Sequence, residues 1–411
     1  MQMTTANTHT TETFLELENQ FSAHNYHPLP VVLSRGQGVY VWDVDGKKYY
    51  DFLSGYSALN QGHCHPKIIA SLILQAQQLT LTSRAFHSDR FAEYARFITQ
   101  YFGYDKVLPM NTGVEAVETA IKLARRWGYD VKGIPENKAR IVVFGENFHG
   151  RTSTVISFSS DPSSYTGFGP YMPGFDLIPY NDLNALAKAL QNKEVAAILI
   201  EPIQGEAGVV VPDEGFLNKA YAYCKQANVL FIGDEIQTGL GRTGKMLACD
   251  HENVRPDILI LGKALSGGVL PVSAVLADDE IMLTIKPGEH GSTYGGNPLA
   301  CAVAMTALTV LKEENMMENA AAMGAYFRNG LKSIQSPFIE TIRGKGLLNA
   351  VVIHQTHPES AWELCMELKE NGLLAKPTHG NKIRFAPPLT ISQSQMDECL
   401  EIIEDSLAIL K

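Results

Sequence analysis

The chain contains 411 residues, of which 45% are hydrophobic and 19% are charged. This length predicts roughly two to three domains, and the composition is typical of globular proteins, which excludes a disordered, collagen-like or coiled-coil chain. The formal net charge is −10, from 34 basic and 44 acidic residues. Because no dense run of Lys and Arg is present, we expect no binding to nucleic acid or to an anionic membrane surface.

Residues 1–13 are rich in Thr, Asn and His and contain neither Arg nor an apolar stretch. They fit neither a secretory signal nor a transit peptide, so we expect a mobile tail over the first dozen residues and a cytoplasmic location. The longest apolar runs are far shorter than the ~18 residues that cross a membrane. The six cysteines form no C-x-x-C pair, and we expect reduced thiols, most of them in the core.

The first predicted element is a β-hairpin over residues 39–52, where two alternating β-rich runs flank a turn at Asp45-Gly46. Further along, short continuous apolar runs alternate with helical patterns. Strands are expected over 141–144, 195–200, 229–232 and 258–261. Continuous apolarity is typical of strands covered on both faces, which indicates a largely parallel α/β sheet.

Helical patterns occur between and after these strands. A helix is expected to begin near Val114, and Pro298 opens an almost entirely apolar, hence buried, helix through Leu311. The last helix has an apolar face with helical spacing. That face comprises Met396, Leu400, Ile403, Leu407 and Leu410. Strands near Thr341, Leu348 and Ile383 indicate a compact later unit.

Charged side chains follow three of the predicted strands directly. Glu201 follows the second strand, Asp234 and Glu235 follow the third, and Lys263 follows the fourth. Side chains beyond the carboxyl ends of parallel strands face the usual ligand crevice, so we expect these groups to converge. A single charge after a strand is more often ordinary surface, and only the convergence of three strand ends favours a site.

This set of side chains suits one cofactor. A lysine in a crevice can form a Schiff base with a carbonyl, and an aspartate can hold a protonated pyridine nitrogen, which is the combination that pyridoxal phosphate needs. Residues 111–115 (Asn-Thr-Gly-Val-Glu) form a polar turn that opens a helix, where free N–H groups can bind a phosphate. By itself this turn is about equally well explained as a plain helix cap.

Six segments in chain order resemble the motif series of class III pyridoxal-phosphate-dependent aminotransferases. They are residues 111–116 (NTGVEA), 147–152 (NFHGRT), 201–206 (EPIQGE), 234–239 (DEIQTG), 262–265 (GKAL) and 291–298 (GSTYGGNP). The resemblance implies the α/β architecture of fold type I enzymes, with a large, mostly parallel sheet domain and a smaller C-terminal α/β domain. We therefore expect an N-terminal segment (1–56), a large cofactor-binding domain (57–303) and a small C-terminal domain (304–411).

The resemblance also implies roles for individual residues around pyridoxal 5′-phosphate. Lys263 would hold the cofactor covalently and shuttle a proton, and Asp234 would pair with its ring nitrogen. Phe148 would stack on the ring, Gln237 would contact its phenolic oxygen, and His149 would flank it. The main-chain N–H groups of Gly113 and Val114 would hold the phosphate. Thr293 would reach the phosphate of a neighbouring subunit, which implies a homodimer or a higher homo-oligomer with shared sites.

Four further segments are similar to the branch of this family that acts on the δ-amino group of ornithine. They are residues 25–30 (NYHPLP), 55–58 (GYSA), 81–86 (LTSRAF) and 382–389 (KIRFAPPL). This branch transfers that amino group to 2-oxoglutarate, which gives glutamate and glutamate 5-semialdehyde, the open form of pyrroline-5-carboxylate. The likeness leaves open another class III aminotransferase, acting on N-acetylornithine or 4-aminobutyrate, and a catalytically silent scaffold.

The two unlike substrates explain the residues expected at the substrate end. Guanidinium groups bind carboxylates in a bidentate manner, so Arg151 would clamp the distal carboxylate and Arg384 the α-carboxylate of glutamate. With ornithine bound, Arg384 would be left unpaired at a cost in free energy, and Glu206 would neutralise it. Tyr26 and Tyr56 would contact the carboxylate and α-amine of ornithine.

Two other patterns are interpreted as structural. Residues 239–244 (GLGRTG) match G-x-G-x-x-G, but they neither follow a strand directly nor open a clear helix, so a structural loop is favoured over a nucleotide site. His63-Cys64-His65 has no remote partner residue, and we expect partly buried imidazoles at a turn before Pro66 and no metal.

Overall fold

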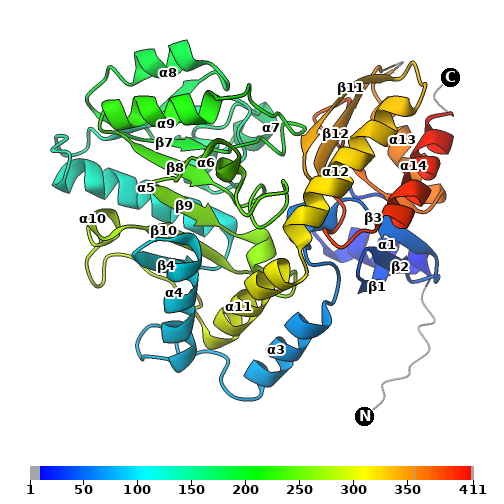
Figure 1. Cartoon of the computed structure of the whole chain (residues 1–411), viewed down its shortest axis with the longest axis horizontal. Coiled ribbons are helices and arrows are strands. Elements are labelled where there is room, and N and C mark those ends of the chain that lie inside the picture. Colours follow the sequence, from blue (N-terminus) through cyan, green and yellow to red (C-terminus); the bar gives the residue numbers. More distant parts are fainter. Residues whose placement is uncertain (1–9, 356, 409–411) are drawn as a thin grey trace.

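The computed structural model describes residues 10–355 and 357–408. Figure 1 shows two bodies side by side, a larger one that contains most of the central chain and a smaller one that contains both described ends. The helical segments are α1 (Thr11–Phe21), α2 (Ser54–Ser57), α3 (Pro66–Ala76), α4 (Asp89–Phe102), α5 (Gly113–Asp130), α6 (Ser153–Ile156), α7 (Pro162–Tyr165), α8 (Leu183–Ala189), α9 (Phe216–Gln226), η1 (Ala248–Glu252), η2 (Lys263–Ser266), α10 (Asp279–Met282), α11 (Pro298–Glu313), α12 (Met316–Ser333), α13 (Ser360–Glu370) and α14 (Gln393–Leu407).

The larger body is built on a seven-stranded sheet with the strand order β4-β10-β9-β8-β7-β5-β6. Its strands are β4 (Lys106–Met110), β5 (Arg140–Phe144), β6 (Phe175–Ile178), β7 (Val195–Ile200), β8 (Leu230–Asp234), β9 (Ile258–Leu261) and β10 (Ser273–Ala277). Strands β9, β8, β7, β5 and β6 pair in parallel, and only β10 runs antiparallel to its two neighbours. The four predicted strands and the mostly parallel sheet are therefore confirmed.

Helices cover both faces of this sheet, which explains the continuous apolar runs. On one face, Val143, Leu199 and Ile232 join the apolar side of α5 in one core cluster. On the other face, Ile198 and Phe231 pack with side chains of α8 and α9. Successive residues of a strand point to opposite faces, so both halves of each run are buried.

The smaller body contains an antiparallel sheet with the order β11-β12-β15-β14, in agreement with the strands expected after Pro298. Its strands are β11 (Ile339–Lys345), β12 (Leu348–Ile353), β14 (Lys376–Thr378) and β15 (Lys382–Phe385). Helices α12, α13 and α14 lie beside it (Figure 1). The predicted apolar helix is α11, and α14 carries the expected apolar face, although Leu410 lies outside the described residues.

The predicted N-terminal hairpin is confirmed as the antiparallel pair β2 (Tyr40–Asp43) and β3 (Lys48–Asp51). Strand β1 (Leu33–Gln37) pairs with β2, and β13 (Leu373–Leu374), from the far end of the chain, pairs in parallel with β3. The N–H of Tyr50 donates to the carbonyl of Gly372 at 2.8 Å. The N-terminal segment is thus joined by main-chain hydrogen bonds to the C-terminal part of the chain.

The three-part division remains a prediction. The limit expected between residues 303 and 304 falls inside α11, and one continuous apolar core includes side chains of α11, α12 and β12. At the N-terminus, residues 1–9 lie outside the described residues. The expectation of a tail over the first dozen residues is wrong for residues 11 and 12, since Thr11–Phe21 form α1 and the side chain of Thr10 accepts the N–H of Thr13 at 3.4 Å.

Candidate active site

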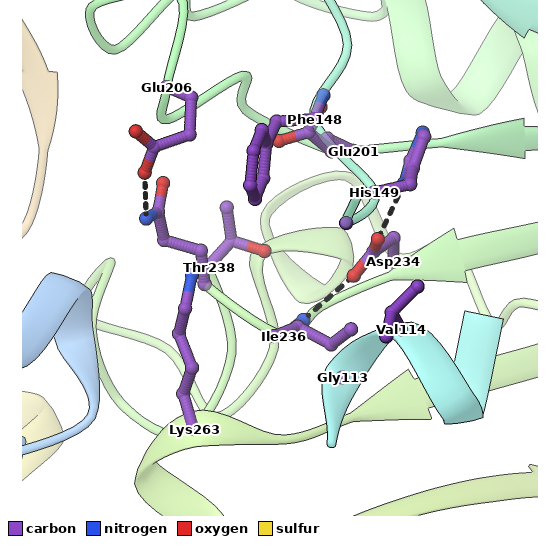
Figure 2. Close-up of a pocket in the computed structure, with 12 residues that line it drawn as sticks. Gly113, Val114, Phe148, His149, Glu201, Glu206, Asp234, Ile236, Thr238 and Lys263 are labelled. Carbon is purple, nitrogen blue, oxygen red and sulfur yellow. Dashed lines mark hydrogen bonds and ion pairs between the residues drawn. The ribbon is translucent and has the colours of Figure 1, made fainter. Parts of the chain in front are cut away.

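A pocket of about 240 Å³ lies at the carboxyl ends of the parallel strands. It is lined by Gly113, Val114, Phe148, His149, Gly150, Glu201, Glu206, Asp234, Ile236, Gln237, Thr238 and Lys263. Asp234 ends β8, Lys263 follows β9, Glu201 follows β7, and Gly113 lies three residues after β4. The expected convergence is therefore present for Glu201, Asp234 and Lys263. Glu235 does not line the pocket, and its Oε1 accepts the N–H of Cys249 at 2.7 Å. Figure 2 shows Lys263 and Asp234 on opposite sides of this pocket, with the Phe148 side chain between those of Glu206 and His149.

Lys263 begins η2, directly after Gly262, and has a φ of 44°. This left-handed conformation is unfavourable by roughly 1–2 kcal/mol for a residue with a Cβ, and such strain is typical of functional positions. Burial lowers the pKa of the ammonium, a shift that the Glu206 carboxylate opposes and the Arg384 guanidinium reinforces. The site therefore favours the neutral, nucleophilic amine.

Asp234 forms a buried ion pair with His149, in which Nδ1 lies 2.6 Å from Oδ2. Its other oxygen accepts the N–H of Ile236 at 3.1 Å. Burial alone would lower the pKa of His149, but the hydrogen bond and the charge of Asp234 outweigh it and raise the pKa. Both oxygens of Asp234 therefore have a hydrogen-bond partner, which fixes the position of this carboxylate beside the pocket.

Glu201 was recognised as a strand-end carboxylate but not predicted as a site residue. It is buried, and its Oε1 accepts the N–H of Phe148 at 2.9 Å. Burial raises the pKa of this carboxyl to about 7, with a smaller opposing effect from His149. Glu201 thus anchors the segment that carries Phe148 and His149. Its position directly after an apolar strand was the signal that could have identified it.

The turn before α5 is both a helix cap and part of the pocket. Thr112 and Glu115 form a capping box, in which the Thr112 side chain accepts the N–H of Glu115 at 3.4 Å. Gly113 and Val114 occupy the first positions of α5, where free N–H groups and the helix dipole favour an anion. Gly150 lies against Val114, since a Cβ at Gly150 would approach Val114 Cγ2 to 2.4 Å. The two explanations of this turn are therefore compatible.

Glu206 and Arg384 form an ion pair at the edge of the pocket, with Nη1 2.6 Å from Oε1. The same carboxylate oxygen accepts Gln237 Nε2 at 2.9 Å. Burial alone would raise the pKa of Glu206, but the charges of Arg384 and Lys263 outweigh it and lower the pKa. We expected this pairing from the sequence resemblance, and the structure brings these two residues together although they are 178 positions apart in the chain.

The four remaining predicted residues are not among those that line the pocket. The Tyr56 ring lies 5.0 Å from Arg384 Cζ, and Arg151 Cζ lies 5.6 Å from the ring of Phe148. Tyr26 is 69% exposed and lies 5.9 Å from Lys376 Nζ. Thr293 is exposed and does not line the pocket, and its neighbour Ser292 accepts Asn111 Nδ2 at 2.8 Å. A role for these four residues remains a prediction.

The residues of the pocket match the chemical groups of pyridoxal phosphate. The cofactor needs an amine for its aldehyde, a carboxylate for its ring nitrogen, an aromatic neighbour and an anion site, and Lys263, Asp234, Phe148 and the start of α5 supply them. Gln237 Oε1 and Arg384 Nε are buried and have no hydrogen-bond partner within the described chain. Gln237 lines the pocket, so its amide oxygen can contact a bound group, and the residues present fit pyridoxal phosphate.

The two patterns interpreted as structural do not take part in this pocket. In the 239–244 loop, the fully buried Arg242 donates to the carbonyls of Leu347 and Pro387 and to Asn60 Oδ1, so the loop links distant segments. His63 Nε2 lies 2.7 Å from Asp51 Oδ2, and His65 Nε2 lies 3.2 Å from Glu314. Over the described residues, no cluster of three or more His, Cys, Asp or Glu side chains could hold a metal ion.

Two other predictions concern the chain as a whole. The six cysteines are free, and five of them are buried, as expected. Cys64 alone is exposed. None of the helices formed by residues 10–355 and 357–408 has the length and apolarity to cross a membrane.

Comparisons with known proteins agree with this geometry. The family model described as aminotransferase class-III matches residues 21–407. "Ornithine aminotransferase, mitochondrial" from Drosophila melanogaster is 62% identical over 390 residues, which cover 95% of this chain and 90% of the relative. The structure of an ornithine aminotransferase from Toxoplasma gondii, with partial occupancy of PLP at its active site, has a TM-score of 0.96 at 51% identity and covers 97% of this chain and 94% of its own.

A structure of an acetylornithine aminotransferase from Elizabethkingia anophelis is also similar. It has a TM-score of 0.90 at 56% identity, and the match covers 98% of this chain and 100% of the chain in that structure. The family match spans nearly the whole chain and includes every strand and every side chain of the pocket. The protein therefore belongs to the class III aminotransferase family.

Proposed function

We propose that this protein transfers the δ-amino group of L-ornithine to 2-oxoglutarate, with pyridoxal 5′-phosphate as its cofactor. The products are glutamate and glutamate 5-semialdehyde, which cyclises to pyrroline-5-carboxylate. The observation that carries this proposal is the Glu206–Arg384 ion pair beside Lys263, because it supplies a carboxylate clamp that can be neutralised. An enzyme that alternates between one substrate with a carboxylate near the reacting amine and one without it needs such a pair.

When bound, pyridoxal phosphate supplies an aldehyde that condenses with amines and a ring that withdraws electrons. Gly113 and Val114 would hold its phosphate, and Asp234, which is paired with His149, would hold its ring nitrogen. Lys263 would bind it covalently. As a neutral amine, Lys263 Nζ would accept and hold the proton that leaves the reacting carbon of the substrate.

Arg384 and Glu206 would distinguish the two half-reactions. With ornithine in the pocket, methylene groups lie at this position, and Glu206 keeps the buried guanidinium paired. With glutamate or 2-oxoglutarate, the α-carboxylate takes the place of Glu206 on Arg384. The exchange replaces one ion pair with another, so the buried charge of Arg384 is never left uncompensated.

The distal end of the substrate would lie toward Arg151, Tyr56 and Tyr26. A second pocket of about 210 Å³ shares Phe148 and Glu206 with the first and includes Ser164. Arg151 Nη1 donates to Ser164 Oγ at 3.4 Å, so the guanidinium lies at the border of this space. Arg151 would bind the α-carboxylate of ornithine or the γ-carboxylate of glutamate, and the two tyrosines would surround the free α-amine.

N-acetylornithine is the second candidate substrate, because the similar structure from Elizabethkingia anophelis is that of an acetylornithine aminotransferase. This substrate has the same reacting amine and the same carboxylate, and it differs only in its capped α-amine. The environment of Tyr56 and Tyr26 therefore decides between the two substrates.

Assembly and location are part of the same proposal. Thr293 is exposed and does not line the pocket of its own chain, which supports its reaching the site of a second subunit in a homodimer. Sedimentation at several concentrations would measure the assembly. The Drosophila melanogaster relative is named mitochondrial, whereas our prediction for this chain is cytoplasmic, and fractionation of the native cells would decide between them.

The function is tested by two successive half-reactions on the purified yellow protein. Ornithine alone should bleach the absorbance and release pyrroline-5-carboxylate, and 2-oxoglutarate should then restore the colour and release glutamate. Bleaching by N-acetylornithine or 4-aminobutyrate but not by ornithine would contradict the substrate and leave the cofactor assignment intact. A Tyr56→Ile variant should lose activity with ornithine and gain activity with other ω-amines.

A further inference from the structure

The segment that carries Tyr56 has an unusual backbone. Residues Ser54, Gly55, Tyr56 and Ser57 have φ angles of 51°, 55°, 60° and 71°, so α2 is a single left-handed turn. Only Gly55 adopts this conformation freely, because a Cβ in the left-handed region lies too close to the following carbonyl oxygen. Three of the four residues are strained, and contacts outside the turn must hold it in place.

Asp51 provides these contacts at the start of the turn. Its Oδ1 accepts the N–H groups of Leu53 at 2.9 Å and Ser54 at 2.8 Å. Its Oδ2 lies 2.7 Å from His63 Nε2, and its side chain is 11% exposed. One buried carboxylate therefore fixes the main chain where it enters the left-handed turn.

His63 is itself fixed by the N-terminal sheet. Its main chain exchanges two hydrogen bonds with Gly38, at 2.8 and 2.9 Å. The imidazole lies directly on Gly36, where a Cβ would approach Nδ1 to 2.6 Å. The imidazole is thus confined between Gly36 and Asp51, so the carboxylate has a rigid partner.

The turn presents Tyr56 to the substrate end of the pocket. The Tyr56 ring lies 5.0 Å from Arg384 Cζ, and its carbonyl accepts Gln237 Nε2 at 3.5 Å. The chain just before the turn is bonded to the end of β15, the strand that carries Arg384, since the N–H of Ala386 donates to the carbonyl of Phe52 at 2.7 Å. A right-handed turn would direct the Tyr56 side chain elsewhere, because reversal of φ changes the direction of Cβ.

We infer that Asp51 and His63 are positioning residues that hold the left-handed turn of Ser54–Ser57 and thereby direct Tyr56 at the substrate, so that they determine substrate choice. The inference rests on the proposed function, in which Tyr56 contacts ornithine but not the cofactor. It assigns a role to His63, which the sequence presented only as part of a weak metal-like pattern.

The chain offers a matched control at the other end of the same hairpin. Asp43 is equally buried, its Oδ1 accepts the N–H groups of Asp45 at 3.1 Å and Lys47 at 2.8 Å, and its Oδ2 accepts the Tyr49 hydroxyl at 2.7 Å. Asp43→Ala therefore removes the same kinds of hydrogen bond without touching the left-handed turn. Asp51→Asn is the conservative variant, because its amide oxygen still accepts the two N–H groups.

The experiment measures kcat/KM for ornithine and for glutamate in separate half-reactions of the holoenzyme, together with the thermal midpoint. Asp51→Ala should lower the ornithine-to-glutamate ratio by about tenfold or more, mainly through KM for ornithine. His63→Ala should lower it by less, and Asp51→Asn should stay within about threefold of the parent. Asp43→Ala should lower the thermal midpoint by a similar amount and leave the ornithine-to-glutamate ratio of kcat/KM unchanged. In a Tyr56→Ala background, Asp51→Ala should leave the ratio unchanged.

Crystal structures of the parent and of Asp51→Ala test whether Asp51 holds the turn, whichever substrate the enzyme uses. We expect residues 54–57 to leave the left-handed region in the variant. An unaltered turn, or a change in ratio no larger than that of Asp43→Ala, would overturn the inference. If the parent itself does not react with ornithine, the proposed function fails, and the two crystal structures still decide whether Asp51 holds the turn.

Discussion

Arg384 Nη1 lies 2.6 Å from Glu206 Oε1, and the Arg384 side chain is only 2% exposed. A guanidinium buried to this extent needs a partner at all times, since an unpaired buried charge is strongly destabilising. Glu206 is the less buried of the two and lies on a loop, so it is the side chain that can move. In this ion pair, therefore, Arg384 is the fixed partner and Glu206 is the partner that can be exchanged for a substrate carboxylate.

Glu206→Ala should shift the preference of the enzyme toward glutamate. Without its carboxylate, Arg384 is free to bind an α-carboxylate, so KM for glutamate should fall by about fivefold to tenfold, and kcat/KM for ornithine should fall by at least that factor. Half-reaction kinetics with each substrate measure both effects. In an Arg384→Ala background the same substitution should no longer alter KM for glutamate, and an unchanged effect there would contradict the exchange.

Lys263→Ala should abolish turnover, with a loss of at least ~10³-fold in the single-turnover rate, because no other amine lines the described pocket. Lys132→Ala is the matched control. Lys132 is also partly buried, and burial lowers its pKa to about 8. Its Nζ, however, donates to the carbonyls of Val195 and Ala227, which lie at or just before the ends of β7 and β8 that lie away from the pocket. Substantial turnover in Lys263→Ala, or a comparable loss in Lys132→Ala, would disprove the assignment.

Glu201→Gln should change how stability depends on pH. The pKa of the Glu201 carboxyl is about 7 in the folded protein and 4.5 in the reference state, so the folded state binds the extra proton between these values. The free energy of unfolding of the parent therefore falls as pH rises from 4.5 to about 7. Glutamine still accepts the Phe148 N–H but does not titrate.

Denaturant unfolding of both proteins across this range measures the effect. The stability of the variant relative to the parent should rise with pH by up to about 3 kcal/mol and level off at each end of the range. A difference that stays constant with pH would show that Glu201 does not titrate in this range.

Arg242→Met should destabilise the protein, because this side chain links the 239–244 loop to distant segments. Its fully buried guanidinium donates to Asn60 Oδ1, Leu347 O and Pro387 O, and these acceptors would lose their partners, at a cost of roughly 3 kcal/mol or more. Arg255→Met, which removes an exposed pair with Asp278, should cost less than ~1 kcal/mol. Denaturant midpoints of the two variants provide the comparison, and equal midpoints would contradict the structural role of the 239–244 loop.

Local patterns predicted four of the five inner strands of the seven-stranded sheet, whereas β10, which is also fully buried, was not predicted. Strands β5, β7, β8 and β9 occupy the centre of the sheet, and each appears in the sequence as a continuous apolar run. Strands β4 and β6 lie at the edges of this sheet, and β4 contains Pro109, which an edge position tolerates. Half-exposed strands of four or five residues lack a distinctive pattern, so these two were not predicted.

The sequence by itself determined the family, the cofactor chemistry and the strand-end positions of Asp234 and Lys263, because these depend on residue types at short spacing. The tertiary structure alone decided the pairing of β3 with β13, the ion pair of His149 with Asp234 and the anchoring of Phe148 by Glu201. It also decided the hand of the turn that carries Tyr56. These features join residues tens to hundreds of positions apart or oppose the local backbone preference, and only the packing of the whole chain makes them favourable.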